Sequence, residues 1–228
     1  MFILSRLDSV PPESFQNQIR ELVIHHVSTL SSVAIRADNP LYPLYQYGVG
    51  MEVHQYLQAL DGTRGLAVEL TLALDAHAPD QLLGFALTLP AQDNPLACAV
   101  AFLAVLPSHR RQGIARALLA DAQTRYSSVE LSAFASQVPW FEAMGMQAVA
   151  TSGPQVLMSS TGQASGALIG RVDIAPIYQT TEIHQIHTYL LNQQGEEAMV
   201  EAESQRDEWL DELAVQAKDC VKQRKTVH

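Results

Sequence analysis

The apolar positions along the chain change their spacing several times, and each spacing predicts a type of element. Residues 66–74 alternate large apolar with smaller or polar side chains, a period of two that predicts a strand with one buried face. Residues 97–106 (ACAVAFLAVL) are almost continuously apolar, which is typical of a strand buried on both faces. After a polar turn, Ile114, Ala117 and Leu118 follow the spacing of one helix face. The chain should therefore pass from a buried strand through a turn into a helix.

The same analysis predicts an alternation of strands and helices over the whole chain. Because a helical crossover normally joins parallel neighbours, the strands at 97–106 and 129–135 should be parallel, within an otherwise antiparallel meander. The fold class is thus α/β (α+β). The expected strands are 1–11, 66–74, 81–89, 97–106, 129–135 and two within 147–160, and the expected helices are 12–30, 51–60, 114–126, 180–192 and 196–223.

Residues 31–50 contain two prolines and two glycines and are predicted to be irregular. Tyr42, Tyr45 and Tyr47 are clustered in this segment. They could bracket an acceptor molecule, or they could simply attach a long loop to the domain, and the sequence supports both interpretations equally.

The turn before the helix at 114–126 carries a concentration of positive charge. A helix start leaves about four backbone N–H groups unpaired and is the positive end of the helix dipole, so anionic oxygens are stabilised there. Gly113 and Ala115 keep bulk away, while Arg110, Arg111 and Arg116 supply charge. The turn is therefore predicted to bind phosphate groups.

This stretch resembles motif A of the GNAT superfamily of acyl-CoA-dependent N-acyltransferases. The family's loop, Arg/Gln-x-x-Gly-x-Gly/Ala, is matched by Arg110, Gly113 and Ala115, after a strand that ends in Val105-x-Pro107. Three further segments are similar to the family's third strand, its fifth strand, and its short helix with sixth strand. They are 80–89 (DQLLGFALTL), 129–135 and 139–149 (PWFEAMGMQAV), and the resemblance covers about residues 64–160.

The resemblance implies a GNAT-like mixed, mostly antiparallel sheet flanked by helices. Strands 4 and 5 would splay apart in a V that admits the pantetheine arm of acetyl-CoA, the implied acyl donor. Backbone N–H groups around Leu103 to Val105 would polarise the thioester oxygen. The implied cofactor-binding residues are Leu103, Ala104, Val105, Arg110, Arg111, Gln112, Gly113, Ile114, Ala115 and Arg116.

Two departures from the family concern catalysis. Phe141 stands where relatives frequently place a tyrosine acid, and the strand at 97–106 has no carboxylate to act as the base. Glu69 is the candidate base and Tyr45 a candidate acid, although Glu69 could equally be a solvent-exposed residue. The predicted function is transfer of an acetyl group to a primary amine of a small molecule or protein. The alternative is a non-catalytic acyl-CoA-binding or protein-interaction module.

Charge and composition restrict the kinds of partner and the location that we expect for this chain. A formal net charge of −10 argues against broad nucleic-acid binding and favours cationic acceptors. No apolar run reaches 18 residues, so no membrane span is expected. Cys98 and Cys220 are isolated, which indicates neither disulfides nor a metal site and suggests a reducing, cytoplasmic location.

The chain is expected to divide into a GNAT-like domain at 1–160 and a mostly helical C-terminal extension at 161–228. Residues 181–228 carry ten acidic and five basic side chains, half of the net charge. The apolar stripe of the last helix should pack either on its own domain or on a second copy of the chain in a homodimer.

Overall fold

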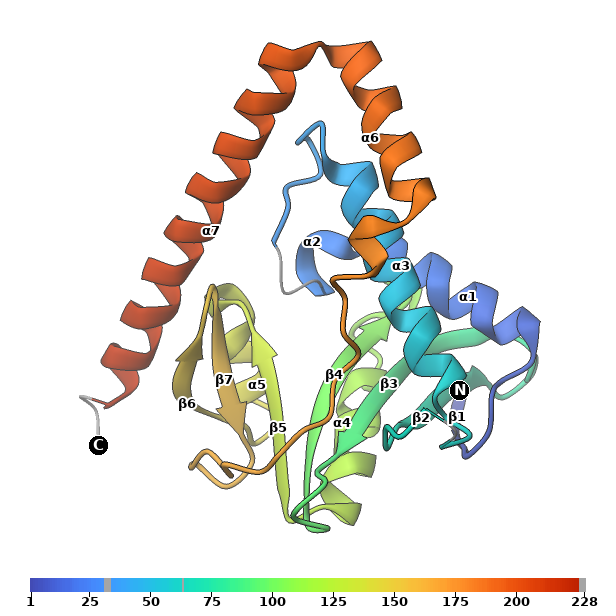
Figure 1. Ribbon diagram of the computed structural model, residues 1–228. Helices are drawn as coiled ribbons and strands as arrows, with labels where there is room; N and C mark the ends of the chain where they lie inside the picture. Colours follow the sequence, from blue (N-terminus) through green and yellow to red (C-terminus); the bar gives the residue numbers. More distant parts are fainter. Residues whose placement is uncertain (31–33, 63, 226–228) are drawn as a thin grey trace.

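The computed structural model describes residues 1–30, 34–62 and 64–225 and contains a seven-stranded mixed sheet with helices on both faces (Figure 1). The strand order is β1-β2-β3-β4-β5-β7-β6. All neighbouring strands are antiparallel except β4 and β5, which are parallel, so the predicted fold class is confirmed. The strands are β1 (Phe2–Leu7), β2 (Glu69–Asp75), β3 (Leu82–Pro90), β4 (Ala97–Val105), β5 (Ser128–Ala133), β6 (Gln147–Ser152) and β7 (Gln155–Ser159).

Seven helices connect and cover the strands among the described residues. Helices α1 and α3 lie on one face of the sheet, where their apolar side chains share a core with Leu70, Leu72 and Leu74 of β2. Helix α4 covers the other face, and its Ile114 and Leu118 pack with Ala73 and Ala86. The helices are α1 (Glu13–Ile24), α2 (Val27–Leu30), α3 (Tyr42–Gln58), α4 (Ile114–Arg125), α5 (Val138–Glu142), α6 (Thr181–Gln194) and α7 (Glu196–Lys225), with 3₁₀ turns η1 (Pro107–His109), η2 (Ala135–Gln137) and η3 (Ile177–Gln179).

Helix α3 begins at Tyr42, so the prediction of an irregular segment up to residue 50 was wrong over its second half. Pro43 lies in the first helical turn, where the missing N–H costs nothing. Gly48 is required by close packing rather than by a turn: a Cβ there would lie 2.5 Å from the hydroxyl oxygen of Tyr178. Tertiary contact thus overrides the low helix propensity of glycine. Residues 31–33 of the predicted segment lie outside the described residues.

The C-terminal helices form an arch over the splayed end of the sheet (Figure 1). Helix α6 packs on α3, and α7 crosses to the other side and packs on β6 and β7. Ile183, Leu190 and Met199 are buried in the main core, whereas Ala217 and Val221 join the core beneath β5, β6 and β7. The predicted apolar stripe of α7 is therefore buried within the chain itself. The division at residue 160 stays a prediction, because side chains from both sides of it share the same cores.

No helix in the described parts of the chain is both long and apolar enough to cross a membrane.

Candidate functional site

The parallel strands β4 and β5 part soon after they begin to pair. Their register contains three pairs, from Ala97 with Ser128 to Ala99 with Glu130. Beyond these pairs the strands diverge in the V that Figure 1 shows between them. The splay between strands 4 and 5 was predicted, and its consequence is a row of strand backbone groups without a sheet partner.

The direction of these free groups follows from one hydrogen bond. Leu106 N donates to Leu83 O on β3 at 2.8 Å. Because successive amides in a strand point to opposite sides, those of Leu103 and Val105 point away from β3 and into the V. The Val105 carbonyl lies on the same side and accepts a hydrogen bond from Arg110 Nε at 3.5 Å. Two N–H donors are thus available along the open edge of β4.

The turn after β4 has the backbone geometry of an anion-binding loop. Arg111 has a φ of 62° and Gly113 a φ of 82°, both in the left-handed region. For arginine this conformation is uncommon and strained, and such residues concentrate at functional sites. Helix α4 begins directly afterwards with no side-chain cap on its free N–H groups. These N–H groups and the helix dipole therefore face the space in front of the turn.

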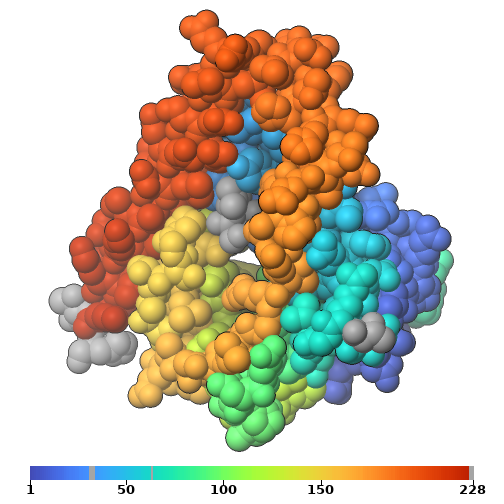
Figure 2. Space-filling model, viewed as in Figure 1, coloured from blue at the N-terminus to red at the C-terminus, as the bar shows by residue number. Residues whose placement is uncertain are grey.

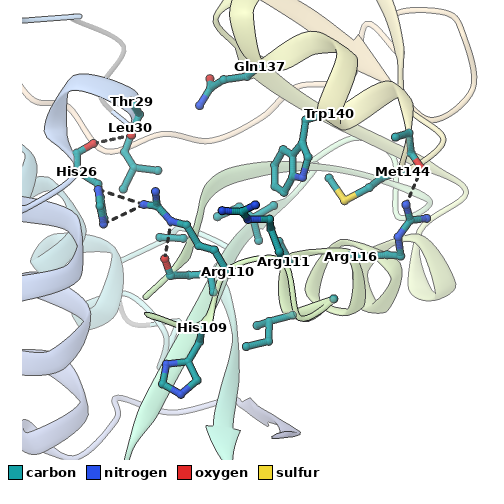
Figure 3. Close-up of a pocket in the computed structure, with 17 residues that line it drawn as sticks. His26, Thr29, Leu30, His109, Arg110, Arg111, Arg116, Gln137, Trp140 and Met144 are labelled. Atoms are coloured by element: carbon teal, nitrogen blue, oxygen red, sulfur yellow. Dashed lines mark hydrogen bonds between the residues drawn. The ribbon is translucent and has the colours of Figure 1, made fainter. Parts of the chain in front are cut away.

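A cavity of about 610 Å³ opens in front of this turn (Figure 3). We call it the basic cavity, because Arg110, Arg111 and Arg116 all line it. A Cβ on Gly113 would meet no atom within 4 Å, so the space beside the loop is open. Nine of the ten predicted cofactor-binding residues line the cavity, and Gln112 does not: the nine are Leu103, Ala104, Val105, Arg110, Arg111, Gly113, Ile114, Ala115 and Arg116.

The three arginines are held by different neighbours. Arg110 Nη2 lies 3.1 Å from His26 Nε2, and Arg116 Nη2 donates to Ala143 O at 2.8 Å. Burial and the charge of Arg110 lower the pKa of His26, so the imidazole stays uncharged at neutral pH. In Figure 3 Arg111 extends into the cavity below Trp140. The site therefore gathers positive charge, and no carboxylate is among the described residues that line it.

Several lining residues come from outside the motif. His26 lies at the break between α1 and α2. Trp140 of α5 is 48% exposed, whereas its neighbour Phe141 is buried. That contrast could have been found from the helical spacing of residues 138–142, because Val138 and Phe141 share one face. The lining residues that the sequence analysis missed include His26, Thr29, Leu30, Gln137, Trp140 and Met144.

Phe141, which replaces the family's tyrosine, packs in the core below β5, β6 and β7. Its ring lies edge-on to Trp140, with 4.6 Å between the ring centroids. Phe141 does not line the basic cavity. The position that relatives use for an acid is therefore filled by a packing residue in this chain.

Glu69 and Tyr45, the two predicted catalytic residues, are both engaged elsewhere. Glu69 pairs with Arg125 and accepts a hydrogen bond from Tyr126 Oη at 2.7 Å, on the α4 side of the sheet. The Tyr45 hydroxyl accepts a hydrogen bond from Arg206 Nη1 of α7 at 3.0 Å. Neither residue lines the basic cavity. The structure does not bring them to the cofactor loop, and their catalytic roles stay predictions.

A second cavity of about 330 Å³ lies further into the V. We call it the carboxylate cavity, because Glu52 of α3 and Glu130 of β5 line it. Residues 99–102 of β4 border it, and residues 103–105 border the basic cavity, so the two cavities follow one another along the strand. Leu30 lines both. A molecule in one cavity is thus placed next to a molecule in the other.

The sheet with its splayed parallel pair, the basic loop and the uncapped helix have the topology of the GNAT fold. Residues 68–147 match the family model described as "Acetyltransferase (GNAT) domain". The match thus identifies a GNAT acetyltransferase domain in this part of the chain.

Two solved structures illustrate what the chain is similar to. PaiA N-acetyltransferase from Thermoplasma acidophilum, in complex with coenzyme A, is 14% identical with a TM-score of 0.51, and the match covers 70% of this chain and 98% of that one. An acetyltransferase of the GNAT family from Staphylococcus aureus Mu50 is 11% identical with a TM-score of 0.46, over 69% of this chain and 98% of that one. A comparison with curated protein sequences gives no match.

Proposed function

We propose that this protein transfers an acetyl group from acetyl-CoA to a primary amine. The observation that carries the proposal is the basic cavity at the opening of the V. Three arginines and the free N–H groups of α4 converge there beside two free amides of β4. Acetyl-CoA matches this arrangement, because its extended pantetheine arm joins a diphosphate at one end to a thioester at the other.

Each part of the cofactor has a place in the proposal. The diphosphate lies against the N–H groups of Gly113 to Arg116 and is paired with Arg110 and Arg111. The pantetheine arm extends between β4 and β5, where backbone groups are free to bond its amides. The N–H of Leu103 or Val105 then donates to the thioester oxygen, which stabilises the negative charge that develops on this oxygen during attack. The coenzyme A bound to the Thermoplasma acidophilum relative supports a CoA donor.

Direct attack by the acceptor, without an acyl-enzyme intermediate, is the reaction proposed. Neither Cys98 nor Cys220 lines the basic cavity, and both are buried. Burial raises the pKa of the Cys98 thiol to about 12, which keeps it protonated and unreactive. The leaving thiolate needs no acid, since a thiol has an ordinary pKa near 8.5. Phe141 is therefore compatible with activity.

Two unpaired, buried cysteines fit a reducing compartment, so we propose a cytoplasmic location. The acidic chain favours cationic acceptors, either small amines or amines of a protein or peptide.

The test combines binding and turnover in one sample. Calorimetry with acetyl-CoA should show binding, and a thiol-release assay with a panel of primary amines should show turnover. Gly113→Ala should weaken acetyl-CoA binding by tenfold or more, because a methyl group then occupies the space of the diphosphate. Gly62→Ala is the matched control, since Gly62 has a φ of 74° and equally open surroundings away from the cavity. Equal acetyl-CoA affinities for the two variants, or a native protein that does not bind CoA, would contradict the proposal.

A further inference from the structure

Glu52 is a partly buried carboxylate at the inner end of the V. It lies on α3, one helical turn after Gly48, and faces the carboxylate cavity together with Glu130 and Arg171. No hydrogen bond or ion pair to its carboxylate is found within residues 1–30, 34–62 and 64–225. Burial raises the pKa of Glu52 to about 7, against the opposing effect of Arg171. The group is thus poised to exchange a proton near neutral pH.

The other groups around Glu52 differ from it in their chemistry or their hydrogen bonding. Tyr56 and Tyr178 both interact electrostatically with Glu52, and burial raises the pKa of each phenol above its ordinary value. Glu130 accepts a hydrogen bond from Ser165 N, which holds its carboxylate in place. Glu52 is therefore the carboxylate of this cavity that has no hydrogen-bond partner among the described residues.

We propose that the carboxylate cavity binds the acceptor and that Glu52 removes the proton from its ammonium group. This inference rests on the proposed acetyl transfer. The ammonium, R–NH₃⁺, gives one proton to the Glu52 carboxylate, and the free amine attacks the thioester carbonyl carbon. The C–S bond breaks, and the second proton lost by nitrogen goes to the departing thiolate. The products are the N-acetyl amine, CoA thiol and a protonated Glu52, which returns its proton to water.

The dimensions and charge of this cavity select a compact cationic amine. Its volume of about 330 Å³ is at the lower end of small-molecule sites. Two carboxylates favour an ammonium group, as an opposite charge does in a partly buried site. In Figure 2 an opening lies between the β6–β7 hairpin and the segment that leads to α6, and residues of both line the cavity. A short primary alkylamine could enter there without displacing the cofactor from the other side.

The experiment compares Glu52→Gln with the native protein, using propylamine and trifluoroethylamine as acceptors. Because its three fluorine atoms withdraw electrons, trifluoroethylamine is largely uncharged at neutral pH, so it needs no base to become a nucleophile. A general base contributes about 10²- to 10⁴-fold. Glu52→Gln should therefore lower kcat/KM for propylamine at least 100-fold and for the fluorinated amine less than tenfold. The native pH profile for propylamine should rise to a plateau above about pH 7, and the variant should lose this rise.

Two further variants distinguish the loss of the catalytic base from a change in the cavity and from a disturbed fold. Glu130→Gln changes the other carboxylate of the cavity and should raise KM for propylamine while it leaves the pH profile intact. Glu197→Gln, on the exposed side of α7, should change nothing. Acetyl-CoA affinity should be native in all three variants, because none of these residues lines the basic cavity.

The outcomes distinguish this inference from the proposed function. Turnover by the native protein with Glu52→Gln equally active on both amines would overturn the role of Glu52 and leave acetyl transfer standing. A native protein that binds acetyl-CoA but acetylates no amine would refute both. A pH profile that disappears in Glu130→Gln instead would assign the base to Glu130 and overturn the proposal for Glu52.

Discussion

The two cavities of the V differ in how the chain builds them. The loop and helix start of the basic cavity come mainly from one stretch, residues 103–116, with a few side chains added by His26, by α2 and by residues 137–144 around α5. The carboxylate cavity is assembled from segments that are far apart in the sequence: α2, α3, β4, β5, the β6–β7 hairpin and the segment around Arg171. A local stretch can be recognised as a motif. A site made of six segments exists only after folding.

The two cavities also differ in charge. The basic cavity presents three arginines and the positive end of α4, whereas the carboxylate cavity presents two glutamates and one arginine. In the proposed function, these charges direct an anionic cofactor and a cationic acceptor to different ends of the V, so that their reacting groups meet beside β4. The predictions that follow test whether the two ends are separable.

The largest expected effect is on the cofactor end. The double change Arg110→Ala with Arg111→Ala should weaken CoA binding by on the order of 100-fold or more, since each hydrogen bond to a charged group contributes about 1.5–3 kcal/mol. Calorimetry with CoA measures the loss. S-acetylpantetheine, which lacks the diphosphate, is the matched ligand, and Lys218→Ala is the control for lost positive charge. A double variant that loses both ligands equally would mean a disturbed fold rather than lost phosphate contacts.

At the other end, Glu52 should make stability depend on pH. Its pKa of about 7 lies above its ordinary value of 4.5, so the folded state binds more protons than the unfolded state between these values. Glu52 therefore lowers the free energy of unfolding as pH rises from about 4.5 to 7. Above pH 8, Glu52→Gln should be more stable than the native protein by up to about 3 kcal/mol, and at pH 4 the two should agree. Urea unfolding at both pH values measures this difference, and a constant difference would contradict the raised pKa.

The next largest effect is expected at the contact between Gly48 of α3 and Tyr178 of η3. Gly48→Ala places a methyl group 2.5 Å from the Tyr178 hydroxyl oxygen, so η3 must shift away from α3. The expected cost is about 1–3 kcal/mol in the free energy of unfolding, with a higher KM for the amine and native CoA affinity. Gly50→Ala is the control, because its new methyl meets only the flexible end of Ile24 at 3.3 Å. Chemical unfolding and steady-state kinetics measure the two effects, and equal costs at both positions would contradict the packing argument.

The smallest effects are expected from Glu69→Gln and Tyr45→Phe. The first removes a partly exposed ion pair with Arg125 and the second a hydrogen bond to Arg206, each worth about 1 kcal/mol or less. Because Arg125 and Arg206 lie outside both cavities, each substitution should change kcat less than threefold. A drop of tenfold or more in kcat, with the fold intact, would show that one of them acts in catalysis after all.

The cofactor end could be predicted because its determinants are local. A buried strand, a loop of arginines with Gly113 and a helix start specify their own geometry within about 15 residues, whatever surrounds them. The exposure of Trp140 could also have been predicted from helical spacing, because Val138 and Phe141 share the buried face of α5 and Trp140 lies off that face. Helix α3 was mispredicted in its first half because the reason for Gly48 is Tyr178, 130 residues later in the chain.

The fold class, the order of the strands in the meander, the parallel pair and the basic loop could be inferred from the sequence alone, since hydrophobic period, glycine placement and helix-end chemistry act over short distances. The folded structure was needed to show that α3 extends back to Tyr42, that α7 buries its apolar stripe on β6 and β7, and that Glu52 has no hydrogen-bond or ion-pair partner among the described residues. These outcomes depend on which distant side chains displace water from one another. Burial, which raises the pKa of a carboxylate, is a property of the folded chain and not of any stretch within it.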